Sequence, residues 1–434
     1  MAELPLEGIR VIGIENNWAG PYCTQLLGDL GAEVFKVESR YHWETYSRGL
    51  IAHPSKLVID NIPTWLGGYP DREPGDRPWN RSPTYNRCLA SKHSMTVDMT
   101  RPDGLDHFKR LVKISDVVVE NNALGVLEKL GITYEMLKEQ RQDIIYCRLP
   151  GYGKTGPYAG RRALGTHIAA CTADTMLRWY PGVDLMTAPM RFHSDTAGGV
   201  NAVFAVIAAL HHRQKTGEGQ LIEVSQAENV LPAYVQATME YILNGRNIEG
   251  TGNRDYYHNA PCGVYRCKGE DRWVAIHVIS DREWEGLCRA MGNPPWTKDP
   301  RFAESVSRYN NQDELDKLIE EWTLQHDHYA LMYLLQKEGV PAGPVMDARD
   351  CYNDPHLKER GFFEPLTQED CGTHLYPTVP WRFTTTPLHL RLPPCRFGAD
   401  NEYVYKTLLR VSDEEYAKLE QDGHIGMEFV PEIL

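Results

Sequence analysis

Short apolar runs alternate with segments of helical periodicity in the first part of the chain. The run Gly8–Ile14 (GIRVIGI) is rich in β-branched residues, which is typical of a buried strand. Tyr22–Gly31 has helical spacing and ends at a glycine that suits a helix C-terminus. A second apolar run, Ala32–Glu38, follows directly. A strand, a helix and a strand within about 30 residues form a βαβ unit, which predicts a parallel sheet.

The same alternation continues to about residue 225 and predicts a doubly wound α/β sheet. The further strands expected are Ser94–Asp98, Asp116–Glu120, Ile144–Leu149 and Gln220–Ser225. The helices expected are Gly104–Val112, Gly125–Gln140 and Thr196–His212. We therefore expect a large α/β domain over residues 1–225.

The pattern changes after residue 225 and predicts a smaller α+β domain over residues 226–345. Its expected elements are a long helix Gln226–Asn244, a hairpin Gly263–Val278 and two amphipathic helices, Arg282–Met291 and Asp313–Gln325. Residues 346–434 follow as a C-terminal part in which short strands and turns are expected. No internal repeat or low-complexity tract divides the chain further.

Residues 41–85 interrupt the alternation and contain six prolines and three tryptophans, Trp43, Trp65 and Trp79. Long loops without secondary structure are uncommon unless they are functional or disordered. The dense aromatic residues favour order. Two interpretations stay open, an ordered lid or partner-wrapping insertion and a flexible loop.

Composition narrows the class of protein. Hydrophobic residues make up 42% of the chain and charged residues 24%, as in soluble globular proteins. The net charge of −13 offers no basic face for a nucleic acid. The longest apolar run, Val200–Leu210, is too short to cross a bilayer, and the first residues lack the apolar core of a secretory signal. We therefore expect no nucleic-acid or membrane partner.

The ten cysteines are scattered, without a CxxC pair or zinc-type spacing. In a chain of 434 residues this pattern predicts reduced thiols in a cytoplasmic protein. No cluster of His, Cys, Asp and Glu has the spacing of metal ligands, so no metal is expected.

Parallel α/β sheets bind ligands beyond the carboxyl ends of their strands. The turn after the first strand, Asn16–Pro21 (NNWAGP), lacks the GxGxxG pattern of dinucleotide sites. The connector Gly151–Gly160 (GYGKTGPYAG) is not a Walker A motif, and no GxSxG motif indicates a hydrolase nucleophile. With these three motifs excluded, we expect only that the chain is an enzyme that binds a small molecule.

Two residues carry possible chemistry. Asp195, in RFHSDTAGG, precedes a helix of small residues, where it is either a plain N-cap or a nucleophile. The positive end of a helix dipole favours a carboxylate in either role. His167, in LGTHIAA, is either a satisfied structural histidine or a proton-transfer group. The residue pattern leaves both pairs of alternatives open.

Five motifs in order resemble those of the class III CoA-transferases, a family that includes formyl-CoA transferase, carnitine and bile-acid CoA-transferases and α-methylacyl-CoA racemases. The resemblance covers nearly the whole chain. The motifs are the opening LEGIRVIGI…WAGPYCTQLLGDLGAEVFKVE, SKHSMTVDM at 91–99, VVVENNALGVLEKLGITYEML at 117–137, HHRQKTGEGQLIEVSQAENVL at 211–231 and GVPAGPVMDARDCYNDPHLKERGFF at 339–363.

The resemblance implies a Rossmann-like large domain built from both termini, a smaller inserted domain, and an interlocked homodimer. It also implies that Asp195 is the nucleophile, which forms a mixed anhydride with the acyl group and then an aspartyl-CoA thioester. CoA then passes from an acyl-CoA donor to a carboxylic acid acceptor. Coenzyme A is thus a substrate, and no cofactor is expected to stay bound.

The resemblance further implies contacts with CoA. Among them, Lys129 and Arg162 would pair with its phosphates. The residues at or beside family contact positions are Trp18, Ala19, Arg40, Val97, Asn121, Asn122, Lys129 and Arg162. Of these, Trp18 and Asn122 replace the family's Gln and Phe, and Arg40 follows the matching position, which Ser39 occupies.

One departure from the family keeps alternatives open. The family often carries an acidic residue or a His-Asp pair after the glycine-rich connector, where this chain has Leu164 and Gly165. A racemase needs two proton-transfer groups on opposite faces of the α-carbon. Asp195 and His167 would be those groups in a racemase-type isomerase. A non-catalytic CoA-binding subunit of a hetero-oligomer is the third hypothesis.

Overall fold

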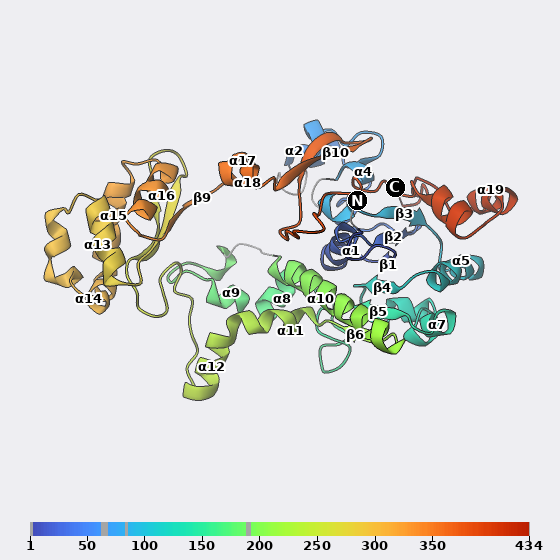
Figure 1. Cartoon of the computed structure of the whole chain (residues 1–434), viewed down its shortest axis with the longest axis horizontal. Coiled ribbons are helices and arrows are strands. Elements are labelled where there is room, and N and C mark those ends of the chain that lie inside the picture. The colour runs from blue at the N-terminus through green and yellow to red at the C-terminus, as the bar shows by residue number, and fades with distance from the viewer. Residues whose placement is uncertain (1–2, 62–67, 83–85, 188–191, 434) are drawn as a thin grey trace. The chain divides into compact units, whose positions relative to one another are not determined.

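The computed structural model describes residues 3–61, 68–82, 86–187 and 192–433. The chain forms two compact units (Figure 1). The first comprises Met1–Ala173, Met190–Val235 and Glu359–Leu434, and the second Asp174–Pro189 and Gln236–Lys358. The first unit is therefore assembled from three separate stretches of sequence.

A six-stranded parallel sheet forms the centre of the first unit. The strand order β3-β2-β1-β4-β5-β6 reverses direction at β1, as in a doubly wound fold. The predicted α/β fold class is confirmed. The strands are β1 (Arg10–Ile14), β2 (Glu33–Glu38), β3 (His93–Thr96), β4 (Val117–Glu120), β5 (Ile145–Arg148) and β6 (Leu221–Glu223).

Helices cover both faces of this sheet, because side chains alternate along each strand and both sets are apolar. Helices α1 (Ala19–Asp29) and α10 (His193–Thr216) pack on one face and against each other. Helices α5 (Pro102–Lys113) and α7 (Tyr134–Gln140) pack on the other. The C-terminal helix α19 (Asp413–Gln421) adds Leu419 to that second core.

Two predicted helices are broken. Gly125–Gln140 is not continuous, because Gly131 adopts a φ of +74° between α6 (Val126–Lys129) and α7. Gln226–Asn244 is divided at Leu231–Tyr234, a 3₁₀ turn that contains Pro232. Proline cannot donate the backbone hydrogen bond that a continuous helix requires. The flanking helices are α11 (Gln226–Val230) and α12 (Val235–Asn244).

The described parts of the insertion at 41–85 are packed into the first unit. The rings of Trp43 and Trp79 lie 4.9 and 5.6 Å from that of Phe429, which stacks on Phe397. Trp65 lies outside the described residues. The tryptophans thus anchor this segment to the C-terminal part, which favours the ordered interpretation. Its elements are α2 (Lys56–Asn61), η1 (Pro70–Arg72) and α4 (Pro78–Arg81).

The C-terminal part contributes an antiparallel hairpin, β10 (Phe363–Gln368) and β11 (Gly372–Pro377). Arg87 donates to the carbonyl of Pro377 at 2.6 Å, and Asn80 donates to Asp370 at 2.8 Å. These bonds tie the hairpin to the end of the insertion. The remaining elements of the first unit are η2 (Asn86–Leu89), α8 (Gly165–Cys171) and the π-helical turn η7 (Tyr403–Leu408).

The second unit is an α+β body. The predicted hairpin is present as β7 (Cys262–Arg266) and β8 (Trp273–His277), and β9 (Ala342–Val345) completes an antiparallel sheet. Helices α13 (Asp281–Ala290), α15 (Gln312–Thr323) and α16 (His328–Lys337) pack on it around buried Leu287, Ile319 and Leu331. The shorter elements are α9 (Asp174–Leu177), η3 (Leu185–Thr187), η5 (Pro295–Lys298), η6 (Pro300–Phe302), α14 (Ser305–Asn310), α17 (Ala348–Asn353) and α18 (Pro355–Glu359).

Among the described residues, no helix has the length and apolar character needed to cross a membrane. In the same ranges no group of three or more His, Cys, Asp and Glu side chains is placed to hold a metal ion.

Candidate active site

The predicted site residues gather at one edge of the parallel sheet. Trp18 and Ala19 follow β1, Asn121 and Asn122 follow β4, and Arg162 lies in the connector after β5. Because the carboxyl ends of parallel strands meet at one edge, these residues come from the edge that binds ligands in this fold class.

Two asparagines after β4 hold the turn between β1 and α1. The backbone N–H of Asn16 donates to Oδ1 of Asn121 at 2.8 Å, and Nδ2 of Asn121 returns a bond to the carbonyl of Asn16 at 2.7 Å. Asn122 accepts from the Asn16 side chain at 3.0 Å and donates to the carbonyl of Ile14 at 2.7 Å. Asn17 has a φ of +58°, a left-handed conformation. These four bonds fix the strained turn that leads to Trp18.

The start of α1 lies beside the start of α10. Trp18 and Phe192 are the N-cap residues of the two helices, and their ring centroids lie 5.4 Å apart. About two turns farther along α10, a Cβ on Gly199 would lie 3.0 Å from the carbonyl oxygen of Ala19. Close packing thus places the turn after β1 next to the first turn of α10.

Asp195 is the third residue of α10, and the N-cap is Phe192. The N-cap alternative for Asp195 is therefore wrong, because the helix begins at His193, three residues earlier than an N-cap at Asp195 would require. The residue is 9% exposed. Burial raises the pKa of Asp195 to about 6, although its own backbone N–H opposes the rise. Such a group is ionised at neutral pH but poorly solvated.

Gly165 makes room for the carboxylate of Asp195. A Cβ at this glycine would lie 2.2 Å from Oδ2 of Asp195, which is far inside van der Waals contact. The hydroxyl of Ser194 donates to the carbonyl of Gly165 at 3.4 Å, which joins α8 to the start of α10. The sequence shows that this position departs from the family, but not that the departure leaves space beside Asp195.

His167 lies in the first turn of α8 and is exposed. The backbone N–H of Leu164 donates to Nδ1 of His167 at 3.1 Å. A neutral ring that accepts at Nδ1 carries its proton on Nε2. The imidazole is therefore oriented by the backbone, and its role in proton transfer stays a prediction.

The other four predicted CoA contacts differ in their surroundings. Arg40 donates to the carbonyls of residues 423, 425 and 428 near the C-terminus, at 2.7–3.3 Å. Val97 is fully buried in the core below the sheet edge. Lys129 and Arg162 are the two exposed cations in this group, whereas Arg40 is half-buried and already donates to backbone carbonyls.

Sequence patterns did not reveal a set of buried ion pairs beneath this edge. Lys92 pairs with Glu15 at 2.9 Å, Lys36 with Glu44 at 2.6 Å, and Arg48 with Glu38 at 2.6 Å. The only signal was the presence of Lys36 and Glu38 within the apolar run 32–38.

The pKa values in this set show how strongly its charges interact. Burial raises the pKa of Glu44 to about 7, and the charge of Glu38 adds to the rise. Burial would lower the pKa of Lys36, but the carboxylates of Glu44, Glu38 and Glu15 raise it above its usual value. The lysine therefore stays charged inside the protein.

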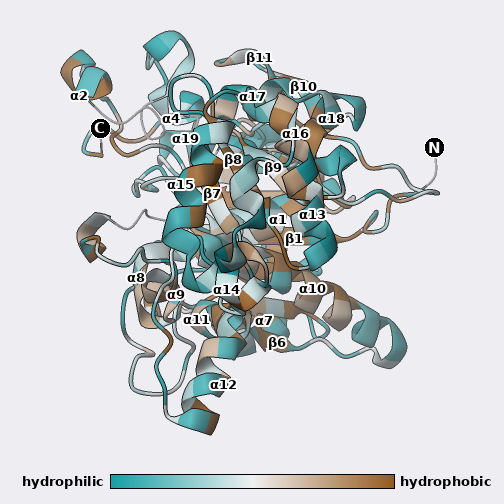
Figure 2. Ribbon diagram, turned by 90° about the vertical axis from the view of Figure 1, so that its left-hand side faces the viewer, coloured by the Kyte–Doolittle hydropathy of each residue, from teal (hydrophilic) through white to brown (hydrophobic). Residues whose placement is uncertain are grey.

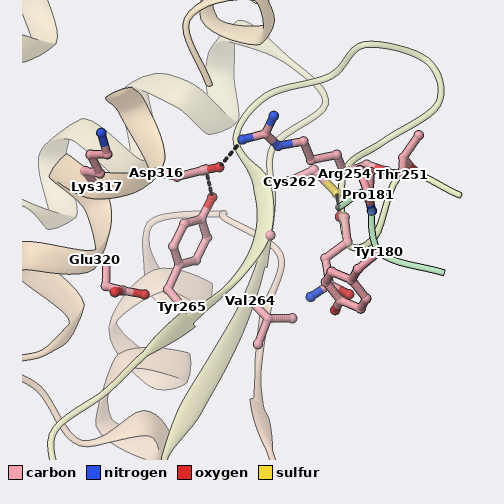
Figure 3. Close-up of a pocket in the computed structure, with 12 residues that line it drawn as sticks. Tyr180, Pro181, Thr251, Arg254, Cys262, Val264, Tyr265, Asp316, Lys317 and Glu320 are labelled. Carbon is pink, nitrogen blue, oxygen red and sulfur yellow. Dashed lines mark hydrogen bonds and ion pairs between the residues drawn. The ribbon is translucent and has the colours of Figure 1, made fainter. Parts of the chain in front are cut away.

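The second unit contains a cavity of about 420 Å³ (Figure 3). The guanidinium of Arg254 bonds to Asp316 at 3.1 Å and also to Asp313. The hydroxyl of Tyr265 donates to Asp316 at 2.8 Å, and burial raises the pKa of this aspartate. Arg254, one of the two cationic residues that line the cavity, is thus already paired. None of the predicted site residues lines this cavity, which is formed by Tyr180, Pro181, Thr251, Asn253, Arg254, Cys262, Gly263, Val264, Tyr265, Asp316, Lys317 and Glu320.

Comparison with known proteins shows the family to which this chain belongs. The family model of the CoA-transferase family III matches residues 6–401. The chain belongs to CoA-transferase family III. It is an enzyme of that class, in agreement with the motifs in the sequence.

Individual relatives match over nearly their full length. The chain is 31% identical to succinyl-CoA–D-citramalate CoA-transferase of Chloroflexus aurantiacus, over 96% of this chain and 97% of that one. It is 32% identical to the alpha subunit of succinyl-CoA–L-malate CoA-transferase of the same organism, over 96% and 92%. A CAIB/BAIF family protein from Brucella suis has a similar structure, with a TM-score of 0.80 and 29% identity, over 94% of this chain and all of that one.

Proposed function

We propose that this family III transferase moves CoA from an acyl-CoA donor to a carboxylic acid through Asp195. The observation that carries the proposal is a carboxylate with 9% exposure in the first turn of a 24-residue helix, with a pKa raised by burial to about 6. A poorly solvated carboxylate is a stronger nucleophile than one in water. Its position at the sheet edge suits an acyl-CoA bound over the turn after β1.

The reaction begins when an oxygen of Asp195 attacks the donor's thioester carbonyl. The carbon–sulfur bond breaks, CoA thiolate leaves, and a mixed anhydride remains. The thiolate then attacks the aspartyl carbonyl, which releases the donor acid as a carboxylate and leaves an aspartyl-CoA thioester. The acceptor carboxylate attacks that thioester to form a second anhydride and free thiolate. Attack of the thiolate on the acceptor carbonyl forms the new acyl-CoA and regenerates Asp195.

Small dicarboxylic acids are the proposed substrates, with succinyl-CoA as donor. The two relatives described above are named for succinyl-CoA and for citramalate or malate, which are short dicarboxylic acids. In the described part of the insertion, Trp43 and Trp79 pack on the C-terminal part and are not available to line an acyl pocket.

The CoA moiety is proposed to lie along the sheet edge, next to Trp18, Ala19, Asn121 and Asn122. Exposed Lys129 and Arg162 are the proposed partners of its phosphates. The remaining predicted contacts, Arg40 and Val97, hold the fold that supports this edge. No other cofactor is required by the chemistry.

The enzyme is proposed to act as a homodimer in the cytoplasm. The ten cysteines form no disulfide, and seven of them are buried, as suits a reducing compartment. The relative named as an alpha subunit keeps a hetero-oligomer as the alternative assembly.

The test is the intact mass of the protein after it is mixed with succinyl-CoA, acetyl-CoA or a branched acyl-CoA. We expect a CoA adduct with succinyl-CoA, mapped to Asp195, removed by hydroxylamine and absent from Asp195→Ala. An adduct that persists in Asp195→Ala would contradict the proposal. No adduct, together with deuterium uptake at the α-carbon of the acyl group in heavy water, would identify a racemase-type isomerase instead.

A further inference from the structure

A buried ion pair joins β3 to the start of α1. The side chains of Lys92, just before β3, and Glu15, just after β1, are both 0% exposed. Nζ of Lys92 lies 2.9 Å from Oε1 of Glu15 and also donates to the carbonyl of Pro21 at 2.9 Å. One ammonium group therefore bridges the two ends of the turn that contains Trp18 and Ala19.

Glu15 is held by two further groups. The hydroxyl of Thr24 in α1 donates to Oε1 of Glu15 at 3.0 Å. Nζ of Lys36 in β2 donates to the backbone carbonyl of Glu15 at 3.0 Å. Hydrogen bonds thus hold both the side chain and the main chain of Glu15. Asn121 holds the backbone of the next residue, Asn16.

This arrangement is costly for stability alone. The N-terminus of a helix is the positive end of its dipole, where a cation is unfavourable. Two buried ammonium groups nevertheless lie beneath the first turn of α1. Replacing a buried ion pair with apolar residues of similar volume is often neutral or stabilising. A purely stabilising role therefore does not explain why Lys92 and Glu15 are charged residues rather than apolar ones.

We propose that Lys92 is a positioning residue for the transferase, which acts through Glu15 and the carbonyl of Pro21 to hold the turn after β1 in the shape that receives acyl-CoA. The inference rests on the proposed function, because its kinetic readout requires transfer activity. Lys92 does not touch the substrate. Its effect is carried by the strained turn at Asn17 and by the placement of Trp18 and Ala19.

The experiment separates the charge of the pair from its geometry. Lys92→Met alone leaves the buried carboxylate of Glu15 without its cation and is expected to destabilise the fold. The double variant Lys92→Met/Glu15→Gln removes both charges and keeps an oxygen for Thr24. We expect this double variant to recover most of the thermal stability that Lys92→Met loses.

The kinetic result is expected to differ. The KM of the double variant for succinyl-CoA is expected to stay at least about tenfold above that of the wild type, with a smaller change in kcat.

A matched control lies at the opposite edge of the same sheet. Arg141 pairs with Asp116 at 2.7 Å beside the amino end of β4. Arg141→Met is expected to lower thermal stability without changing KM. A second variant, Thr24→Val, removes one hydrogen bond and no charge, and is expected to raise KM roughly fivefold in a folded protein.

Hydrogen–deuterium exchange of the peptide over residues 15–24 provides a readout that does not depend on activity. Exchange in this peptide is expected to be faster in the double variant than in Arg141→Met. A double variant with wild-type KM and wild-type exchange would overturn the positioning role, as would an unchanged KM in Thr24→Val. A wild-type protein that transfers no CoA would instead contradict the proposed function, and the exchange result would then still decide whether the Lys92–Glu15 pair holds the turn.

Discussion

At the scale of single residues, Asp195 combines burial with charge. Because burial raises its pKa to about 6, the group is protonated below that pH and cannot attack a thioester. We expect kcat/KM to be level above pH 7 and to fall about tenfold per pH unit below 6. The measurement is a pH profile of transfer from succinyl-CoA, with the stability of the protein checked at each pH. A profile that stays flat down to pH 4.5 would contradict Asp195 as the ionised nucleophile.

Because it is buried, the ionised carboxylate of Asp195 is also expected to lower the stability of the folded protein. A carboxyl whose pKa is higher in the folded state than its usual 3.8 holds its proton more tightly when folded, so stability falls as pH rises from about 4 to 6. At neutral pH the cost is about 3 kcal/mol. We expect Asp195→Asn to stabilise the protein at pH 7 and to lose that advantage at pH 4. Thermal unfolding at the two pH values checks this, and an equal effect at both would contradict it.

Gly165 sets the space that Asp195 occupies. A methyl group at this position would lie 2.2 Å from Oδ2, so Gly165→Ala must displace the carboxylate. We expect the rate of adduct formation with succinyl-CoA to fall about a hundredfold, since small misplacements of a reacting group have large effects. Gly160→Ala, in the connector that precedes α8, has no atom within 4 Å of the added carbon; it is the control and should react normally.

At the scale of secondary-structure elements, two adjacent glycines of α10 face different neighbours. A Cβ on Gly198 would meet the flexible side chain of Gln226 at 3.3 Å, whereas one on Gly199 would meet the backbone oxygen of Ala19 at 3.0 Å. Alanine is favoured over glycine in a helix by roughly 0.5–1 kcal/mol. Gly198→Ala is therefore expected to stabilise the protein. Gly199→Ala is expected to lose about 1–3 kcal/mol and to slow transfer, because it forces α10 away from α1.

Denaturant unfolding and the rate of CoA transfer measure this pair of variants. The two substitutions add the same methyl group to the same helix, so propensity cancels between them. Equal stabilities and equal rates in the two variants would show that the contact between α1 and α10 does not position Asp195.

The strands were predictable from the sequence and the helix ends were not. Strands buried on both faces need apolar runs, and such runs mark the buried strands β1, β2, β4 and β5 to within a few residues. The positions of the other two strands, β3 and β6, were also predicted to within a few residues, although β3 is HSMT and β6 is partly exposed. Helical periodicity continues through Gly131 and Pro232, although each of these residues ends a helix. The start of α10 was misplaced for a similar reason, because Phe192 caps it without a side-chain hydrogen bond.

The candidate site was predictable only in part. Asp195 and the turn after β1 were marked by motifs that are local in sequence. The partners that shape them are distant: Gly165 lies 30 positions before Asp195, and Lys92 lies 77 positions after Glu15. A pattern along the chain does not indicate which distant residues will be in contact. These contacts are known only from the folded structure, where α8 meets α10 and Lys92 reaches Glu15.

At the scale of the whole molecule, both units expose apolar helix surfaces. On α10, Val200, Phe204 and Ile207 recur at helical spacing on one face and are 39%, 72% and 38% exposed. In the second unit, α12 buries none of its residues, and Ile242 and Leu243 are 65% and 69% exposed; brown segments mark this helix in Figure 2. Contiguous exposed apolar surfaces of this kind mark interaction sites. The predicted homodimer would cover them.

Phe204→Glu tests this assembly, because a charge in the centre of a buried apolar interface is strongly unfavourable. We expect the wild type to sediment as two chains and Phe204→Glu as one. Leu57→Glu on α2, where the leucine is 75% exposed, is the matched control and should leave the dimer intact. A wild type that sediments as a single active chain would contradict the dimer. Phe204 lies about two and a half turns from Asp195 along α10. Loss of transfer in a folded, monomeric Phe204→Glu would therefore mean that the site around Asp195 depends on the second copy.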